Sequence, residues 1–504
     1  MAPARVTRSK SSAAAKKSSP SFAIGFAYLL ATQLTSKLLP FFINTLVARR
    51  LTPEEFGVPT VHFYLLSTVI LTTREGFRRA LMRDSVEESS LGYAWLVLPV
   101  GGFLSIAVPF AVVWSQNIST STPYGQALLY YGVAAFIELC AEPHYIRAMR
   151  MSAFKLRLSA ETTSTVLRSF LTYALVSYNQ DVVLAFAYSQ LAYAISMAVI
   201  YLNAAPNASE RETGKDEATV KLIGIFSLQA VWKLILAEGE KAALIAVAAA
   251  DEVGVYGLVA SLGAAFARLV LQPFEEAAFV IFTRNVSSKT RSAKEKDVFN
   301  ALLRVAIIFG STAALMGPHF SWLALRILYG ERWANQHFAS ETLGFYAILL
   351  LPLAVNGITE AYAHAVMSSS ELSSSNIWLL VCSLVNVGGT LLLQKSLGPV
   401  SLLVANAVSM VVRIAFTGSY IRRRFVRLKV NTDLKFLSKT YLLVLVVFSI
   451  VAHASARVLR RNPTSLALLA HTGCGAAILA VLLVTLYFNE RDALLHLSRN
   501  DKGD

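Results

Sequence analysis

The stretch VKLIGIFSLQAVWKLILAEGEKAALIAV, residues 220–247, decides the class of fold. It is long enough to cross a bilayer, since about 20 predominantly apolar residues span the hydrocarbon core. Yet Lys233, Glu238, Glu240 and Lys241 place four ionisable groups within it. A charge at that depth costs roughly 2.5–3.5 kcal/mol on insertion scales and normally has a functional role or a charged partner. The stretch therefore predicts a membrane helix that contributes to a functional site.

The rest of the chain repeats this apolar pattern. Of its 504 residues, 55% are hydrophobic and 15% are charged, whereas a soluble domain carries about 25% charged residues. Continuous apolar runs predict an all-α polytopic membrane protein, and their lack of alternation argues against barrel strands. We expect about fourteen transmembrane helices, near residues 21–46, 57–78, 91–114, 124–145, 157–178, 181–203, 220–246, 253–281, 299–319, 342–366, 376–394, 399–421, 438–456 and 465–488.

The distribution of Lys and Arg predicts the orientation, because cytosolic loops carry an excess of both. The N-terminal tail 1–20 holds five of them, and the segment IRRRFVRLKVNTDLK from Ile421 is strongly basic. Segments on the opposite side hold few, with Arg457–Arg461 as the exception. Both termini are therefore expected in the cytosol. Asn117, which lies in a glycosylation sequon, then faces the other side and is a glycosylation candidate.

An internal repeat predicts how the helices are grouped. QLTSKL at 33–38 resembles QAVWKL at 229–234, and EEFGV at 54–58 resembles DEVGV at 251–255, at offsets of 196 and 197 residues. An offset of six spans preserves the direction through the membrane, so the repeats are parallel and related by an axis along the membrane normal. We expect two six-helix lobes plus two C-terminal helices, with a binding site between the lobes near mid-membrane.

The repeat also predicts the division of the chain. We expect a disordered basic cytosolic tail (1–20), an N-terminal six-helix lobe (21–203), a cytosolic linker (204–219), a C-terminal six-helix lobe (220–421), a basic cytosolic loop (422–437), two additional transmembrane helices (438–488) and a cytosolic C-terminal tail (489–504).

Three cations lie near the middle of their predicted spans: Lys37, Lys233 and Arg268. If they converge between the lobes, they suit an anionic ligand, above all a phosphate or pyrophosphate that accepts several charge-assisted hydrogen bonds. The alternative is structural pairing, because Lys233 and Glu240 lie seven residues apart on one helical face, as do Arg268 and Glu275. Both interpretations stay open on the sequence alone.

The motif REGFRRA, from Arg74 to Ala80, closes the second predicted span. Its arginines Arg74, Arg78 and Arg79 are suited to gathering phosphates, with Glu75 holding Arg78 or Arg79 in place, or they anchor the cytosolic end of the span.

Two pairs of ionisable residues also allow two interpretations each. Glu138 and Glu142, one turn apart, carry a proton or cation in a coupled antiporter, or they are carboxylates at a helix end partnered by Arg147. Glu360 and His364 on the tenth span present the same choice.

Enzymatic chemistry finds little support in the sequence. No hydrolase, metalloprotease or phosphate-loop motif is present, and the three cysteines all fall within predicted spans without metal-ligand spacing. We therefore expect a protein that is not an enzyme and that needs no metal or other cofactor.

Four motifs in order resemble a known family over nearly the whole chain. They are REGFRRA, KLILAEGEK, LGAAFARLVLQPFEEAAF from Leu262, and NGITEAYAHAVMS from Asn356. Together they resemble the Rft family of endoplasmic-reticulum membrane proteins, within the multidrug/oligosaccharidyl-lipid/polysaccharide exporter superfamily. The resemblance implies a fold of two six-helix lobes, often with two added helices.

The resemblance also implies a function in N-glycosylation. The expected activity is to flip dolichyl-pyrophosphate-linked Man5GlcNAc2 from the cytosolic to the luminal leaflet of the endoplasmic-reticulum membrane. The expected partners are this glycolipid, membrane lipids and other proteins of the pathway, with no nucleic acid. Two alternatives stay open: a non-transporting accessory protein that binds the glycolipid, and a cation-coupled exporter of small molecules.

The family motifs and the charge pattern together give the candidate residues. Positions that match the family motifs are Arg74, Glu75, Arg78, Arg79, Lys233, Glu238, Gly239, Glu240, Arg268, Gln272, Pro273, Glu275, Glu276, Asn356, Gly357 and Glu360, and Lys155 in FKLR resembles a family position. The predicted substrate-binding residues are Lys37, Arg74, Arg78, Arg79, Lys155, Lys233 and Arg268. The predicted structural or gating charges are Glu75, Glu238, Glu240, Lys241, Glu275, Glu276 and Glu360.

Overall fold

The computed structural model describes residues 38–83, 88–151, 153–204, 217–286, 292–367, 369–428 and 438–499, and these ranges contain helices and no strand. Within them, ten helices are long and apolar enough to cross a membrane, and a bent pair (Pro53–Leu71 with Thr73–Leu81, at 43°) gives an eleventh. The chain is thus an all-α, multi-pass membrane protein, as predicted. The count of fourteen spans stays a prediction.

The first part of the described chain forms one group of helices. After a short apolar helix at Leu38–Ala48, the chain continues through α2 (Pro53–Gly57), the π-helical turn η1 (Val58–His62), α3 (Phe63–Leu71), α4 (Thr73–Leu81), the 3₁₀ segment η2 (Glu88–Leu96), α5 (Val97–Ser115), α6 (Pro123–Cys140), α7 (Glu142–Arg150), α8 (Phe154–Ser177) and α9 (Val182–Ala204).

The second part forms another group. It comprises α10 (Glu217–Val247), α11 (Ala250–Phe266), the π-helical turn η3 (Ala267–Leu271), α12 (Gln272–Val286), α13 (Ser292–Tyr329), α14 (Glu331–Ala334), α15 (Ala339–Val366), α16 (Ser369–Leu397), α17 (Val400–Arg427), α18 (Lys439–Arg461) and α19 (Ser465–Arg499). Several of these helices extend past their predicted span ends; among them, α17 enters the segment predicted as a basic loop, and α19 enters the predicted tail.

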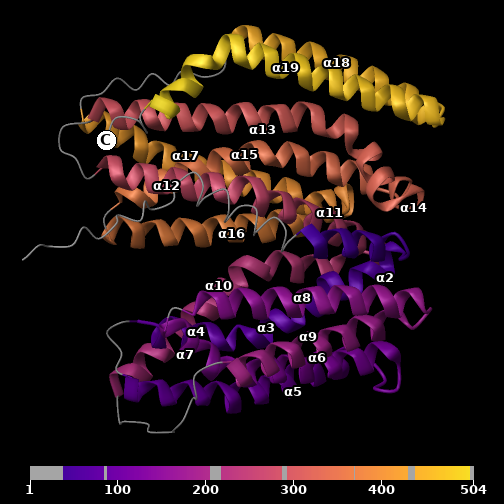
Figure 1. Cartoon of the computed structure of the whole chain (residues 1–504), viewed down its shortest axis with the longest axis vertical. Coiled ribbons are helices and arrows are strands. Elements are labelled where there is room, and N and C mark those ends of the chain that lie inside the picture. The colour runs from indigo at the N-terminus through magenta and orange to yellow at the C-terminus, as the bar shows by residue number, and fades with distance from the viewer. Residues whose placement is uncertain are drawn as a thin grey trace, which may run out of the picture.

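Figure 1 shows the two groups side by side. Helices α3 to α9 make up one half of the molecule, helices α11 to α17 make up the other, and α18 and α19 pack as a pair along α13. Helix α10 contacts α4 in the first half and α16 in the second. This helix carries KLILAEGEK, so the charged stretch lies where the two halves meet.

The repeat motifs EEFGV and DEVGV meet in space. Thr52 caps α2 in a capping box with Glu55, and α2 packs against α11. A Cβ added at Gly57 would lie 2.9 Å from the backbone nitrogen of Gly254, and one at Gly254 would overlap the carbonyl oxygen of Pro53. Only glycine allows this backbone approach. Gly57 and Gly254 are 197 residues apart, so two repeat-equivalent positions contact each other, as expected near a pseudo-two-fold axis.

Contacts between helix ends join the halves beside these glycines. Arg49 donates its Nε–H to the carbonyl oxygen of Leu328 at 2.6 Å and also donates to that of Ile327. In the opposite direction, the buried Trp333 donates its indole N–H to the carbonyl oxygen of Ala48 at 2.8 Å. Carbonyls in the last turn of a helix lack intrahelical donors. Each half therefore caps a helix end of the other.

Candidate functional site

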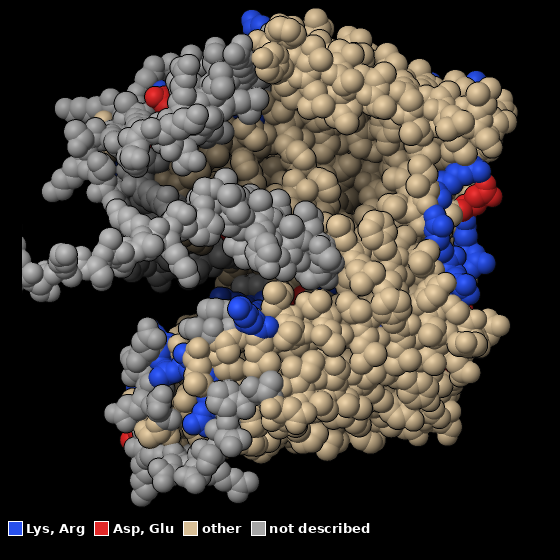
Figure 2. Space-filling view, viewed as in Figure 1, with Lys and Arg blue, Asp and Glu red and all other residues tan. Residues whose placement is uncertain are grey.

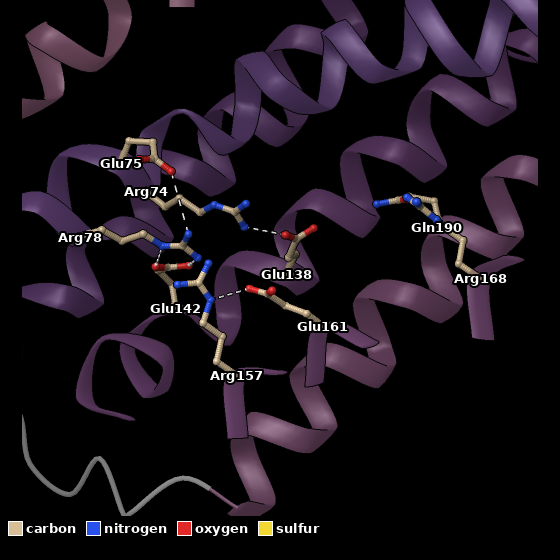
Figure 3. Close-up of polar contacts among 9 residues, drawn as sticks. All are labelled: Arg74, Glu75, Arg78, Glu138, Glu142, Arg157, Glu161, Arg168 and Gln190. Carbon is tan, nitrogen blue, oxygen red and sulfur yellow. Dashed lines mark hydrogen bonds and ion pairs between the residues drawn. The ribbon is translucent and has the colours of Figure 1, made fainter. Parts of the chain in front are cut away.

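Two of the three arginines of REGFRRA contact buried carboxylates (Figure 3). Arg74 on α4 lies 2.5 Å, Nη1 to Oε1, from Glu138 at the end of α6. Arg78 binds Glu142 at the start of α7 through both oxygens, with Nη2 to Oε2 at 2.8 Å. The side chains of Glu138 and Glu142 are only 7% and 2% exposed. Burial of a carboxylate requires such a partner.

These ion pairs change the interpretation of both the arginines and the carboxylates. Arg74 and Arg78 are predicted substrate-binding residues, but in this structure their charges are balanced by carboxylates. Glu138 and Glu142, which the sequence allows as proton carriers or as partners of Arg147, are here the partners of Arg74 and Arg78. The guanidinium carbon of Arg78 also lies 3.9 Å from the ring centre of Tyr145, a cation–π contact that fixes its plane.

Arg79 and Lys233 remain without a balancing partner. No hydrogen bond or ion pair joins either of them to the described residues. Glu75, predicted to hold Arg78 or Arg79, makes a loose ion pair with Arg78 at 3.9 Å. Lys233 is exposed on α10, and its charge interacts unfavourably with Arg79 and favourably with Glu75.

Close packing of α4 on α10 brings these cations together. A Cβ added at Gly76 would lie 2.7 Å from the Cα of Ser227 and would overlap its hydroxyl. Gly76 lies one turn before Arg79, and Ser227 lies less than two turns before Lys233. Because α4 and α10 belong to different halves, the uncompensated positive charge lies at their interface. A phosphate or pyrophosphate would supply the missing negative charge.

Two further polar contacts extend the cluster in Figure 3. Arg157 and Glu161 form an i,i+4 pair on α8 at 2.8 Å, and Arg168 donates to Gln190 at 3.1 Å. Lys155, one of the predicted substrate-binding residues, is exposed at the start of α8.

The other three charged residues of KLILAEGEK each form a hydrogen bond or an ion pair. Glu238 accepts from Lys241 at 2.6 Å and from the hydroxyl of Tyr64 on α3 at 3.1 Å. The Lys241 ammonium lies 4.4 Å from the Tyr64 ring centre. Glu240 accepts from the Asn386 amide on α16 rather than from Lys233. The structure thus does not contain the structural pairing of Lys233 with Glu240, and Glu238 and Lys241 link α10 to the first half.

Three predicted structural charges of the second half, Glu275, Glu276 and Glu360, lie on α12 and α15. Glu360 pairs with Arg413 on α17, with Nε to Oε1 at 3.0 Å, and accepts from the Asn356 amide at 3.0 Å. Glu276 accepts from Gln272 at 2.9 Å. Glu275 packs against Gly357, where an added Cβ would overlap its carboxylate. The sequence analysis missed Arg413, although an arginine in the apolar run VVRIAF is a visible signal.

The roles of three further predicted residues stay predictions. Lys37 and the side chain of Arg268 lie outside the described residues, so the predicted convergence of Lys37, Lys233 and Arg268 stays a prediction. Asn117 is exposed in the turn between α5 and α6 with φ at 53°, and its glycosylation stays a prediction. The described residues contain no cluster of His, Cys, Asp and Glu able to hold a metal ion.

Solved structures with the same fold are transporters and flippases. The inward closed conformation of the lipid II flippase MurJ matches with a TM-score of 0.62, at 11% identity over 93% of this chain and 100% of that one. An inward-facing multidrug resistance MATE family transporter of the MOP superfamily matches with a TM-score of 0.58, at 14% identity over 79% of this chain and 96% of that one. At such identities, the likeness shows the fold alone.

Relatives by sequence identify the family. The Mus musculus Man(5)GlcNAc(2)-PP-dolichol translocation protein RFT1 is 30% identical over 94% of this chain and 95% of its own length. The Dictyostelium discoideum protein of the same name is 25% identical over 77% of this chain and 83% of its own. The family model described as Rft protein matches residues 21–500. This chain belongs to the Rft family.

Proposed function

We propose that this protein flips Man5GlcNAc2-PP-dolichol from the cytosolic to the luminal leaflet of the endoplasmic-reticulum membrane. The names of its relatives support the substrate, and the flippase-like fold supports the movement. The observation that carries the proposal is the close packing of α4 on α10, which brings Arg79 and Lys233, two cations without an ion pair among the described residues, to the interface between the halves.

In this proposal, the pyrophosphate of the glycolipid binds between α4 and α10. The Arg79 guanidinium offers a planar fork of donors to two phosphate oxygens, and the Lys233 ammonium acts as a point charge. The ion pairs Arg74–Glu138 and Arg78–Glu142 hold α4 against α6 and α7, which positions Arg79. Figure 2 shows Lys and Arg side chains on the lower half where it faces the upper half. The sugars cross in water between the halves while the dolichyl chain stays in lipid.

The experiment is the double variant Arg79→Gln/Lys233→Gln, tested for support of N-glycosylation in cells that depend on this protein. Loss of both cations removes the attraction for pyrophosphate, so we expect under-glycosylation at normal protein level, on the order of a tenfold loss of function. Lys395→Gln, which removes an exposed cation from α16, is the matched control and should have no effect. Full function in the double variant would contradict the assignment of the site.

Reconstitution separates flipping from an accessory role. Purified protein in vesicles with labelled Man5GlcNAc2-PP-dolichol should move the label between leaflets, and the double variant should not. Binding without movement would support the accessory protein instead. Transport of a small organic cation driven by a proton gradient, without glycolipid movement, would support an exporter.

A further inference from the structure

Helix α17 carries an exposed stripe that changes from apolar to basic. Val408, Val411 and Ala415 are exposed and recur at intervals of three or four residues, which places them on one helical face. The same face continues through Ser419 to Arg422, and Arg423 and Arg427 are exposed beside it. A helix that leaves the hydrocarbon core for the interface has this pattern.

One arginine of the same run points the other way. Arg424 lies 2.9 Å from Glu295, Nε to Oε1, and the buried Tyr362 donates its hydroxyl to the same carboxylate. Its neighbours Ile421 and Phe425 are buried in the core of the second half. These contacts fix the rotation of the end of α17, so that Arg422, Arg423 and Arg427 face outward.

The outward arginines border an open, shallow groove, and its described lining comes entirely from α17. Its apolar part is lined by Ile414, Ala415 and Gly418, and its basic part by Arg422, Arg423 and Arg427. None of the three arginines forms a hydrogen bond or an ion pair with the described residues. The groove thus combines an apolar lining with three adjacent uncompensated cations, the complement of a lipid that has one anionic phosphate and an acyl chain.

We propose that this groove binds an anionic glycerophospholipid. The phosphate lies among the guanidinium groups of Arg422, Arg423 and Arg427, each of which can donate two parallel hydrogen bonds to phosphate oxygens. One acyl chain lies along Ile414, Ala415 and Gly418. Basic clusters at the end of a membrane helix attract anionic headgroups in this way. The groove lies on α17, which packs on α15 and α16, and it shares no residue with the α4–α10 site.

The test measures how much phosphatidylserine the purified protein retains, by native mass spectrometry of protein taken from nanodiscs of phosphatidylserine and phosphatidylcholine. Each basic residue near an anionic surface contributes roughly fivefold in affinity, which is about 1 kcal/mol. We therefore expect Arg422→Gln/Arg423→Gln/Arg427→Gln to weaken phosphatidylserine binding about 100-fold, and Arg427→Gln alone about fivefold. Binding of phosphatidylcholine should not change.

The matched control is Arg457→Gln/Arg461→Gln, which removes exposed arginines from the end of α18 and should leave phosphatidylserine binding unchanged. If the triple variant is poorly folded by size-exclusion chromatography, the single variant decides. Unchanged phosphatidylserine binding in the folded variants would overturn the proposal. So would displacement of phosphatidylserine by equimolar farnesyl pyrophosphate, since the groove would then belong to polyprenyl pyrophosphates, or equal competition by inorganic phosphate, since no acyl chain would then be bound.

Discussion

At the scale of single residues, the buried acids of the first half explain why REGFRRA cannot act as one cationic cluster. Arg74 and Arg78 lie one turn apart on α4, and Glu138 and Glu142 are also four residues apart. Both ion pairs join residues separated by 64 positions, so α4 runs in the same direction as α6 and α7. The motif alone does not reveal this, because the pairing depends on which helices become neighbours. Arg79, on another face, keeps its charge available.

Removing one partner of a buried ion pair should lower the free energy of unfolding. Arg78→Ala leaves Glu142 buried without a counter-charge, and we expect a loss of about 3–5 kcal/mol in the free energy of unfolding. Denaturation of the purified protein in detergent measures it. The control is Arg157→Ala, whose pair with Glu161 is 47% and 45% exposed and should cost less than about 1 kcal/mol. Equal losses in the two variants would contradict the structural role of Arg78.

At the scale of elements, the sequence predicted the repeat but not the contact it makes. EEFGV and DEVGV are recognisable as equivalent from their spacing, and their glycines suggest close packing of some kind. That Gly57 and Gly254 would pack on each other depends on the position of the symmetry axis, which spacing alone does not give. The same limit applies to Glu240. Its position on the helical face of Lys233 favoured an ion pair with that residue, but α16 packs against α10 and places the Asn386 amide against Glu240 instead.

A side chain at the glycine crossing should force α2 and α11 apart. Gly254→Ala places a Cβ against the carbonyl oxygen of Pro53, where the backbone cannot give way, so we expect a loss of about 1–3 kcal/mol in stability. Gly388→Ala on α16 is the control, because no atom lies within 4 Å of its added Cβ and helix propensity favours alanine. A thermal unfolding midpoint that falls in the first variant and not in the second would confirm the crossing.

At the scale of the whole molecule, two halves meet at one end through helix caps and glycines. The predicted fold class is confirmed, because long apolar runs report directly on membrane helices. The candidate site was only partly predictable. Arg79 and Lys233 were both among the predicted substrate-binding residues, but their shared position depends on α10 packing against α4 across the halves.

The capping contacts predict how this end opens. Arg49→Gln should weaken the hydrogen bonds to the carbonyl oxygens of Ile327 and Leu328, and so increase the fraction of molecules that are open there. A cysteine placed at Val47, which is 1% exposed, reports the opening by its rate of modification with a water-soluble maleimide. We expect that rate to rise about three- to tenfold, from a net value of about 1 kcal/mol per hydrogen bond. No change relative to Arg461→Gln in the same background would refute the role of Arg49.

The use of carbonyl oxygens as acceptors at this end affects how easily the contacts of Arg49 separate. A buried ion pair such as Arg78–Glu142 cannot separate without stranding a charge, whereas Arg49 is exposed and water can replace its contacts as they break. The contacts of Arg49 therefore contribute only about 1 kcal/mol net for each hydrogen bond, whereas Trp333 is buried in a core that both halves share. Buried ion pairs thus hold helices together within the first half, whereas water can replace the contacts of Arg49 between the two halves.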